Sequence, residues 1–108
     1  MRPERRKALV ERKRALLREA RSIQDFLRGS VVVLRRPCTY PGCRRCAQGV
    51  KHPAVYHTVS REGKTQTTYL GASRAPEARG QVAAHRRLLG LLEEVSRINL
   101  TLLTGKER

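Results

Sequence analysis

Apolar residues near the start of the chain recur with the period of an α-helix. From Pro3 to Leu27 there is neither Gly nor interior Pro, and the apolar positions follow one another at intervals of seven, four and three or four residues. They are Leu9, Leu16, Ala20, Ile23, Phe26 and Leu27. Pro3 suits a first helical turn, and Gly29 after Arg28 is a typical stop signal. The pattern predicts an amphipathic helix over 1–28 whose other face is basic.

The last third of the chain repeats the helical period with more leucines. Leu88, Val95 and Leu102 share one heptad position, Leu91 and Ile98 share another, and Leu92 lies alongside. This predicts a packing helix from about Pro76 or Arg79 to Leu103. Gly80 and Gly90 each weaken such a helix by about 1 kcal/mol relative to Ala, so its helicity should depend on a partner surface. The first helix is the nearest partner, although heptads of this number are equally compatible with a dimer seam.

Between the two helices the period changes to two. Ser30–Arg36 is a β-branched run, and two further runs, 54–60 and 64–70, are joined through Glu62 and Gly63. The pattern predicts a three-stranded antiparallel sheet. A turn at Glu62 and Gly63 sets the cross-strand pairs Tyr56–Tyr69, Thr58–Thr67 and Ser60–Thr65. The other face would present Val55, His57, Val59, Gln66, Thr68 and Leu70.

Neither face of this sheet is cleanly apolar, so we expect a helix to cover one face and water to reach the other. The sequence thus predicts an α+β fold in a single domain over 1–108. Its parts are a basic helix at 1–28, a loop and hairpin segment at 29–72, and a heptad-patterned helix at 73–108.

The net charge of the chain limits the classes of function that it can have. The chain has 108 residues, with 24 Lys and Arg against 9 Asp and Glu, which gives a net charge of +15. Nucleic acid is the natural partner for such a balance. Between 29 and 72 the only acidic residue is Glu62. A chain of this length with few aromatic residues builds a small core, so a deep enzyme cleft is not expected.

No apolar run approaches the roughly 18 to 20 residues that would span a bilayer, and the charged start does not resemble a secretory signal. We therefore expect a cytoplasmic protein without membrane contact. In a reducing compartment, clustered cysteines hold metal more often than they form disulfides.

All three cysteines lie in the stretch CTYPGCRRCAQGVKH, which ends on a histidine. Cys38, Cys43, Cys46 and His52 have the spacing C-x4-C-x2-C-x5-H. Zinc takes such Cys3His sets as a closed tetrahedron, which predicts a structural zinc site with no position for a substrate water. Such a site would contribute folding free energy to a chain with a small core.

Three alternatives stay open for this stretch. His57 could replace His52 as the fourth ligand, although it falls within a predicted strand. The cysteines could be unpaired small apolar residues. Redox sensing by Cys43 and Cys46 is the third alternative, since the two arginines between them would lower a thiol pKa.

The order of these features resembles an uncharacterised family of small bacterial and archaeal proteins. Its members carry an RGS sequence, a Cys/Cys/Cys/His knuckle and a GKT hairpin between two helices. The residues that match its pattern are Arg28, Gly29, Ser30, Cys38, Gly42, Cys43, Cys46, His52, Tyr56, Gly63, Lys64, Thr65 and Tyr69. The resemblance implies proximity to mobile elements and their transposases, but no established activity.

The chain departs from that family pattern in two places. The family's last two cysteines are often separated by one residue, whereas two residues separate Cys43 from Cys46. A His-Gly-Pro of the family is His52-Pro53 here. The additional residue puts the implied chelate geometry in question.

Catalysis is not expected, because paired carboxylates and a phosphate-cradling GxxxxGK[ST] element are both absent from the middle segment. The sequence favours a zinc-stabilised accessory protein that binds DNA or RNA, with the polymer left open. The expected contacts are Arg28, Arg35, Arg36, Arg44, Arg45, Lys51, Tyr56, Arg61, Lys64 and Tyr69. The alternative is an adaptor whose Leu-rich helices dock onto a larger protein such as a nuclease or transposase.

Overall fold

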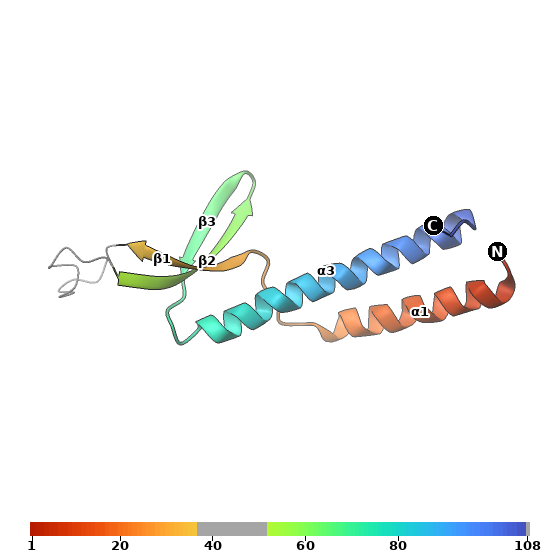
Figure 1. Ribbon diagram of the computed structural model, residues 1–108, viewed down its shortest axis with the longest axis horizontal. Coiled ribbons are helices and arrows are strands. Elements are labelled where there is room, and N and C mark those ends of the chain that lie inside the picture. The colour runs from red at the N-terminus through yellow and green to blue at the C-terminus, as the bar shows by residue number, and fades with distance from the viewer. Residues whose placement is uncertain (37–51, 108) are drawn as a thin grey trace. The chain divides into compact units, whose positions relative to one another are not determined.

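The computed structural model describes residues 1–36 and 52–107. Two helices and one antiparallel sheet make up this part of the chain, which confirms the α+β prediction (Figure 1). The elements are α1 (Pro3–Ser22), β1 (Ser30–Arg36), β2 (His52–Arg61), β3 (Lys64–Tyr69) and α3 (Ala75–Thr104). The chain forms two compact units, one of residues 1–26 with 83–108 and one of residues 27–82. The single domain over 1–108 stays a prediction.

The first helix is shorter than its apolar pattern predicts. It ends at Ser22, whose hydroxyl donates a hydrogen bond of 2.6 Å to the carbonyl of Glu19, and Ile23 is already extended with φ −86° and ψ 100°. A serine hydroxyl that competes for a main-chain carbonyl in the last turn favours such an end. The predicted helix stop at Gly29 is therefore wrong. Gly29, with a φ of +118°, instead lies directly before the first strand of the sheet.

Within the first unit, α1 and the later part of α3 pack as an antiparallel pair (Figure 1). Its core is formed by Leu16 and Ala20 of α1 with Leu91 and Val95 of α3, and Leu91 is only 1% exposed. The core positions match the predicted heptad pattern on α3 and the predicted helical period on α1. The intramolecular pair is therefore the arrangement that these heptads adopt.

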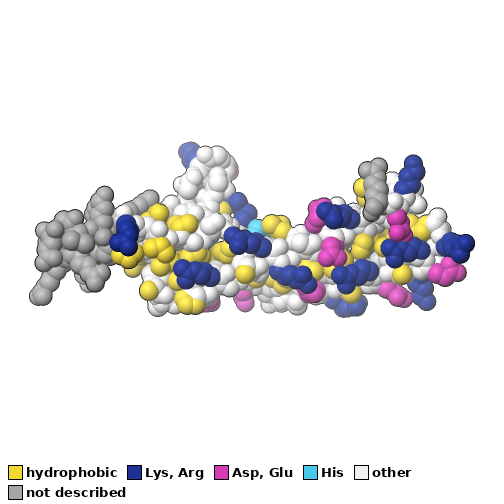
Figure 2. Space-filling model, in the orientation of Figure 1, with side chains coloured by type: hydrophobic (Ala, Val, Ile, Leu, Met, Phe, Trp, Pro, Cys, Tyr) yellow, Lys and Arg dark blue, Asp and Glu magenta, His cyan; other side chains and the backbone are white. Residues whose placement is uncertain are grey.

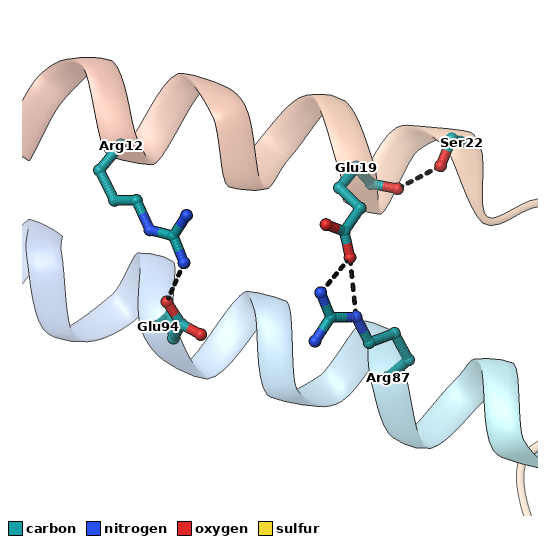
Figure 3. A network of polar contacts seen from close by, with 5 residues as sticks. All are labelled: Arg12, Glu19, Ser22, Arg87 and Glu94. Atoms are coloured by element: carbon teal, nitrogen blue, oxygen red, sulfur yellow. Dashed lines mark hydrogen bonds and ion pairs between the residues drawn. The ribbon is translucent and has the colours of Figure 1, made fainter.

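Ion pairs close one edge of this helix pair. Arg12 contacts Glu94 at 3.2 Å, and Glu19 accepts two contacts from the guanidinium of Arg87 (Figure 3). Arg5 donates to both carboxylate oxygens of Glu107, and this hydrogen bonding lowers the pKa of Glu107 below its ordinary value. The Arg12–Glu94 and Arg87–Glu19 pairs are half exposed, so each contributes at most about 1 kcal/mol. The ion pairs contribute more to the alignment of the two antiparallel helices than to the stability of the helix pair.

Replacing Gly90 with Ala should raise the free energy of unfolding by about 1 kcal/mol, because Ala loses less backbone entropy in a helix interior. No atom lies within 4 Å of a Cβ added at Gly90. Urea denaturation followed by circular dichroism measures the change. The matched control is Gly105→Ala, since Gly105 follows the end of α3 with φ +71° and donates to the Thr101 carbonyl. A left-handed C-cap disfavours Ala, so this control should not stabilise. Equal gains for both variants would contradict the prediction.

The sheet has the order β1–β2–β3, and both neighbouring pairs are antiparallel. The register confirms the predicted partners Tyr56–Tyr69, Thr58–Thr67 and Ser60–Thr65. Glu62 and Gly63 form the turn with φ values of 52° and 76°. Positive φ at both central residues is the requirement of a type I′ hairpin turn. One face of β2 buries His57 and Val59, whereas all of β3 is exposed.

Candidate nucleic-acid interface

A close backbone contact positions the first candidate cation, Arg28. The imidazole Nε2 of buried His57 donates to the carbonyl of Arg28 at 2.8 Å, and the Arg28 guanidinium donates to the carbonyl of Ser60 at 2.9 Å. The chain can approach this closely only because Gly29 has no side chain. A Cβ there would lie 2.3 Å from the carbonyl oxygen of Thr58. Arg28 is thereby held beside the hairpin end of β2.

Two more cations meet at this end of the sheet. Arg61 and Lys64 are direct cross-strand partners, and both are exposed. Like charges opposite one another in an antiparallel pair repel. Arg61 also donates to the side-chain oxygen of Gln66 at 3.0 Å, which restricts the guanidinium. Arg28, Arg61 and Lys64, called here the hairpin cations, therefore form a local concentration of positive charge with oriented donors.

The tyrosine pair lies on the opposite face of the sheet from Arg61 and Lys64. Cross-strand partners share a face and neighbours alternate, so Tyr56 and Tyr69 project from one face while Arg61 and Lys64 project from the other. The two rings meet edge to face with centroids 5.6 Å apart and an interplanar angle of 70°. Tyr69 is 62% exposed. The predicted contact residues therefore do not form one continuous surface.

Arg35 lies apart from the hairpin cations. It pairs with Pro53 on β2, eight residues from Arg61, which corresponds to about 26 Å along a strand. The side chain of Arg36 lies outside the described residues, as do Arg44, Arg45 and Lys51. A contribution of these four cations stays a prediction.

The expectation of a metal-binding protein needs a correction. Among residues 1–36 and 52–107, no group of three or more His, Cys, Asp or Glu side chains could hold a metal ion. His57, the alternative fourth ligand, instead bonds to the carbonyl of Arg28. Cys38, Cys43 and Cys46, together with the side chain of His52, lie outside the described residues, so the structure does not test their ligation.

The basic face predicted for the first helix forms a stripe on α1, although none of its cations was among the expected nucleic-acid contacts. Lys7, Arg14, Arg18 and Arg21 follow one another at intervals of seven, four and three residues. All four are exposed, and helical geometry places them opposite the buried Leu9, Leu16 and Ala20. None belongs to an ion pair among the described residues, whereas Arg5 and Arg12 do. The spacing of the cations was the available signal.

Acidic and basic side chains lie next to one another over the helix pair in the space-filling view (Figure 2). The four ion pairs of the described residues all belong to the unit of residues 1–26 and 83–108. In the described part of 27–82, no cation forms an ion pair with a carboxylate. The sheet unit therefore carries positive charge that its own acids do not neutralise.

A surface hollow of about 440 Å³ lies near the end of α3. It is lined by Arg97, Leu100, Thr101, Thr104 and Lys106. This lining has no carboxylate, imidazole or thiol that could transfer a proton or attack a substrate.

No helix in the described residues combines the length and the apolar composition needed to cross a membrane. No curated protein and no solved structure matches the chain. The association with mobile elements has no support in these comparisons and forms no part of the proposed function. The family model described as Domain of unknown function (DUF6788) matches residues 4–80, so the chain belongs to that uncharacterised family.

Proposed function

We propose that this protein is a nucleic-acid-binding accessory protein without catalytic activity of its own, and that its sheet unit contacts the phosphate backbone. The observation that carries the proposal is the distribution of ion pairs. The described cations of residues 27–82 have no carboxylate partner, whereas acids neutralise cations of the helix pair. Phosphates are the counter-charges that such a surface attracts.

The hairpin cations supply the first part of the argument. Repulsion between Arg61 and Lys64 in the free protein would be relieved by an anion between them. Hydrogen bonds to Gln66 and to the Ser60 carbonyl restrict the guanidinium groups of Arg61 and Arg28 before any ligand arrives. Restriction in advance lowers the entropy cost of binding. A phosphate oxygen can accept from the donors that these bonds leave unused.

The opposite face of the hairpin supplies a second kind of contact. Thr65 and Thr67 of β3 are exposed beside the exposed ring of Tyr69. Hydroxyl groups donate to phosphate and sugar oxygens, and an exposed ring can stack on an unpaired base. A strand of nucleic acid that passed the hairpin edge could reach both faces. This arrangement favours single-stranded segments over an intact duplex.

Fluorescence anisotropy with the full chain tests the proposal. We expect Arg61→Gln/Lys64→Gln to weaken binding to a labelled single-stranded oligonucleotide roughly tenfold at about 0.15 M salt. The slope of log K against log salt should become shallower by about 1.4, because two phosphate contacts to a single strand are lost. Single-stranded DNA, single-stranded RNA and duplex DNA of one sequence identify the preferred polymer.

The matched control is Arg12→Gln/Arg87→Gln, which removes the same charge from cations that already pair with Glu94 and Glu19. It should change the affinity much less than the hairpin variant does. Equal losses in both variants would assign binding to net charge alone and contradict the proposed site. Binding that does not respond to salt would contradict backbone contact altogether.

The adaptor alternative loses part of its basis in the structure. Leu16, Leu88 and Leu91, which made the helices look like docking surfaces, pack inside the helix pair. An adaptor would have to use the leucines that stay exposed on α3. The spacing of those leucines favours a binding partner other than a larger enzyme.

A further inference from the structure

α3 carries a second apolar stripe that α1 does not cover. Leu89, Leu92, Leu100 and Leu103 are 52%, 45%, 54% and 83% exposed. At about 100° per residue these four leucines and Ser96 fall within roughly 80° of one another around the helix. The same geometry places the stripe about 120° from the core residues Leu91 and Val95. A soluble helix rarely exposes so continuous a row of large apolar side chains without a partner.

The stripe is symmetric about Ser96. Leu92 and Leu100 lie four residues before and after it, and Leu89 and Leu103 lie seven residues before and after it. A two-fold axis at Ser96 would therefore bring Leu89 of one copy to Leu103 of the other, and Leu92 to Leu100. Isologous interfaces require this kind of self-complementarity. We propose that the stripe is a homodimer interface in which two α3 helices cross antiparallel at Ser96.

The small side chain of Ser96 fits the crossing point. All the large residues of the stripe lie at least four positions away, so the helices can approach most closely at Ser96. The leucine row from 89 to 103 spans about 21 Å of helix. Each copy would contribute its own α1–α3 pair, which makes the expected assembly a bundle of four helices.

Charges beside the stripe match this antiparallel register. Glu93 and Arg97 lie on the same flank of the stripe and bond to each other within one chain, at 3.3 Å. Across the proposed axis, Arg97 would lie about 3 Å along the helix from Glu93 of the second copy. Residues on the same flank meet in an antiparallel pair of helices. Two symmetric Glu–Arg contacts would therefore border the leucines.

The interface leaves the existing helix pair intact. Arg87 and Glu94, which bond to α1, lie roughly 140° to 160° around α3 from Leu89 and Leu92. Dimerisation therefore does not compete with the ion pairs of Figure 3. The leucines that it removes from water are those that the monomer leaves exposed.

Sedimentation equilibrium of the full chain tests the proposal. We expect the mass of two chains for the native protein and of one chain for Leu92→Glu/Leu100→Glu, with unchanged helix content by circular dichroism. The matched control is Val33→Glu, because Val33 is also an exposed apolar residue but lies on β1. It should leave the two-chain mass in place. A one-chain mass for the native protein at hundreds of micromolar, or a two-chain mass that survives the leucine changes, would overturn the proposal.

Cysteine crosslinking tests the register and does not depend on the glutamate variants folding. Ser96→Cys should form a disulfide between the two copies of position 96, identified by mass spectrometry of peptides. Leu89→Cys should not link to itself, since an antiparallel pair separates the two copies of residue 89 by about 21 Å. A mixture of Leu89→Cys and Leu103→Cys should link between the two positions. Self-linking at 89 would show a parallel pair and overturn the antiparallel interface.

Discussion

Replacing Gly29 with Ala is expected to lower the free energy of unfolding of the sheet unit by about 3 to 5 kcal/mol. The added Cβ would lie 2.3 Å from the Thr58 carbonyl oxygen and 2.8 Å from Nε2 of His57. Both neighbours would have to move, and the hydrogen bond from His57 to the Arg28 carbonyl would be disturbed. The φ of +118° adds backbone strain for any residue with a side chain.

Urea denaturation monitored by circular dichroism measures this effect. Gly63→Ala is the control, because Gly63 also has a positive φ of 76° but no atom lies within 4 Å of an added Cβ. The Gly63→Ala variant therefore has only the cost of placing a side chain at positive φ, about 1 kcal/mol. If Gly29→Ala destabilised the chain no more than Gly63→Ala does, the close contact with Thr58 and His57 would be wrong.

Replacing Leu91 with Ala should cost about 2 to 5 kcal/mol, the range for truncating a fully buried leucine. Leu91 lies at the centre of the helix-pair core and contributes nearly all of its side-chain surface to that core. Thermal denaturation at fixed protein concentration should show a marked fall in the midpoint.

Leu17→Ala is the comparison for this variant. Leu17 is an exposed leucine on α1 and does not belong to the buried core cluster. Leu17 is 38% exposed against 1% for Leu91, so its truncation loses less apolar burial and we expect a smaller change, of about 1 kcal/mol. Similar losses for Leu17 and Leu91 would mean that α1 and α3 do not pack through the residues described.

The strand register was predictable because local chemistry determines it. Glu62 and Gly63 occupy a two-residue turn, and a turn of that length leaves one pairing for Tyr56, Thr58 and Ser60. The placement of Arg61 and Lys64 on the opposite face from the Tyr pair also follows from strand alternation. It is predictable from the sequence, because the turn at Glu62 and Gly63 fixes which residues share a face.

The end of α1 was less predictable. Ile23, Phe26 and Leu27 continue the apolar period beyond Ser22, yet the helix stops there and Gly29 enters the sheet. Apolar periodicity indicates which residues are suited to burial. It does not identify the backbone conformation that buries them. The role of Gly29 depends on Thr58 and His57, which are about thirty residues away in the chain.

Short-range patterns in the sequence determined the helices, the hairpin turn, the cross-strand partners and the excess of positive charge. Only the tertiary structure decided which cations are neutralised and which leucines stay exposed. Arg12 meets Glu94, and Leu91 packs near Leu16, across separations that no local pattern encodes. Net charge is a sum over residues, whereas neutralisation and burial depend on distances that exist only after folding.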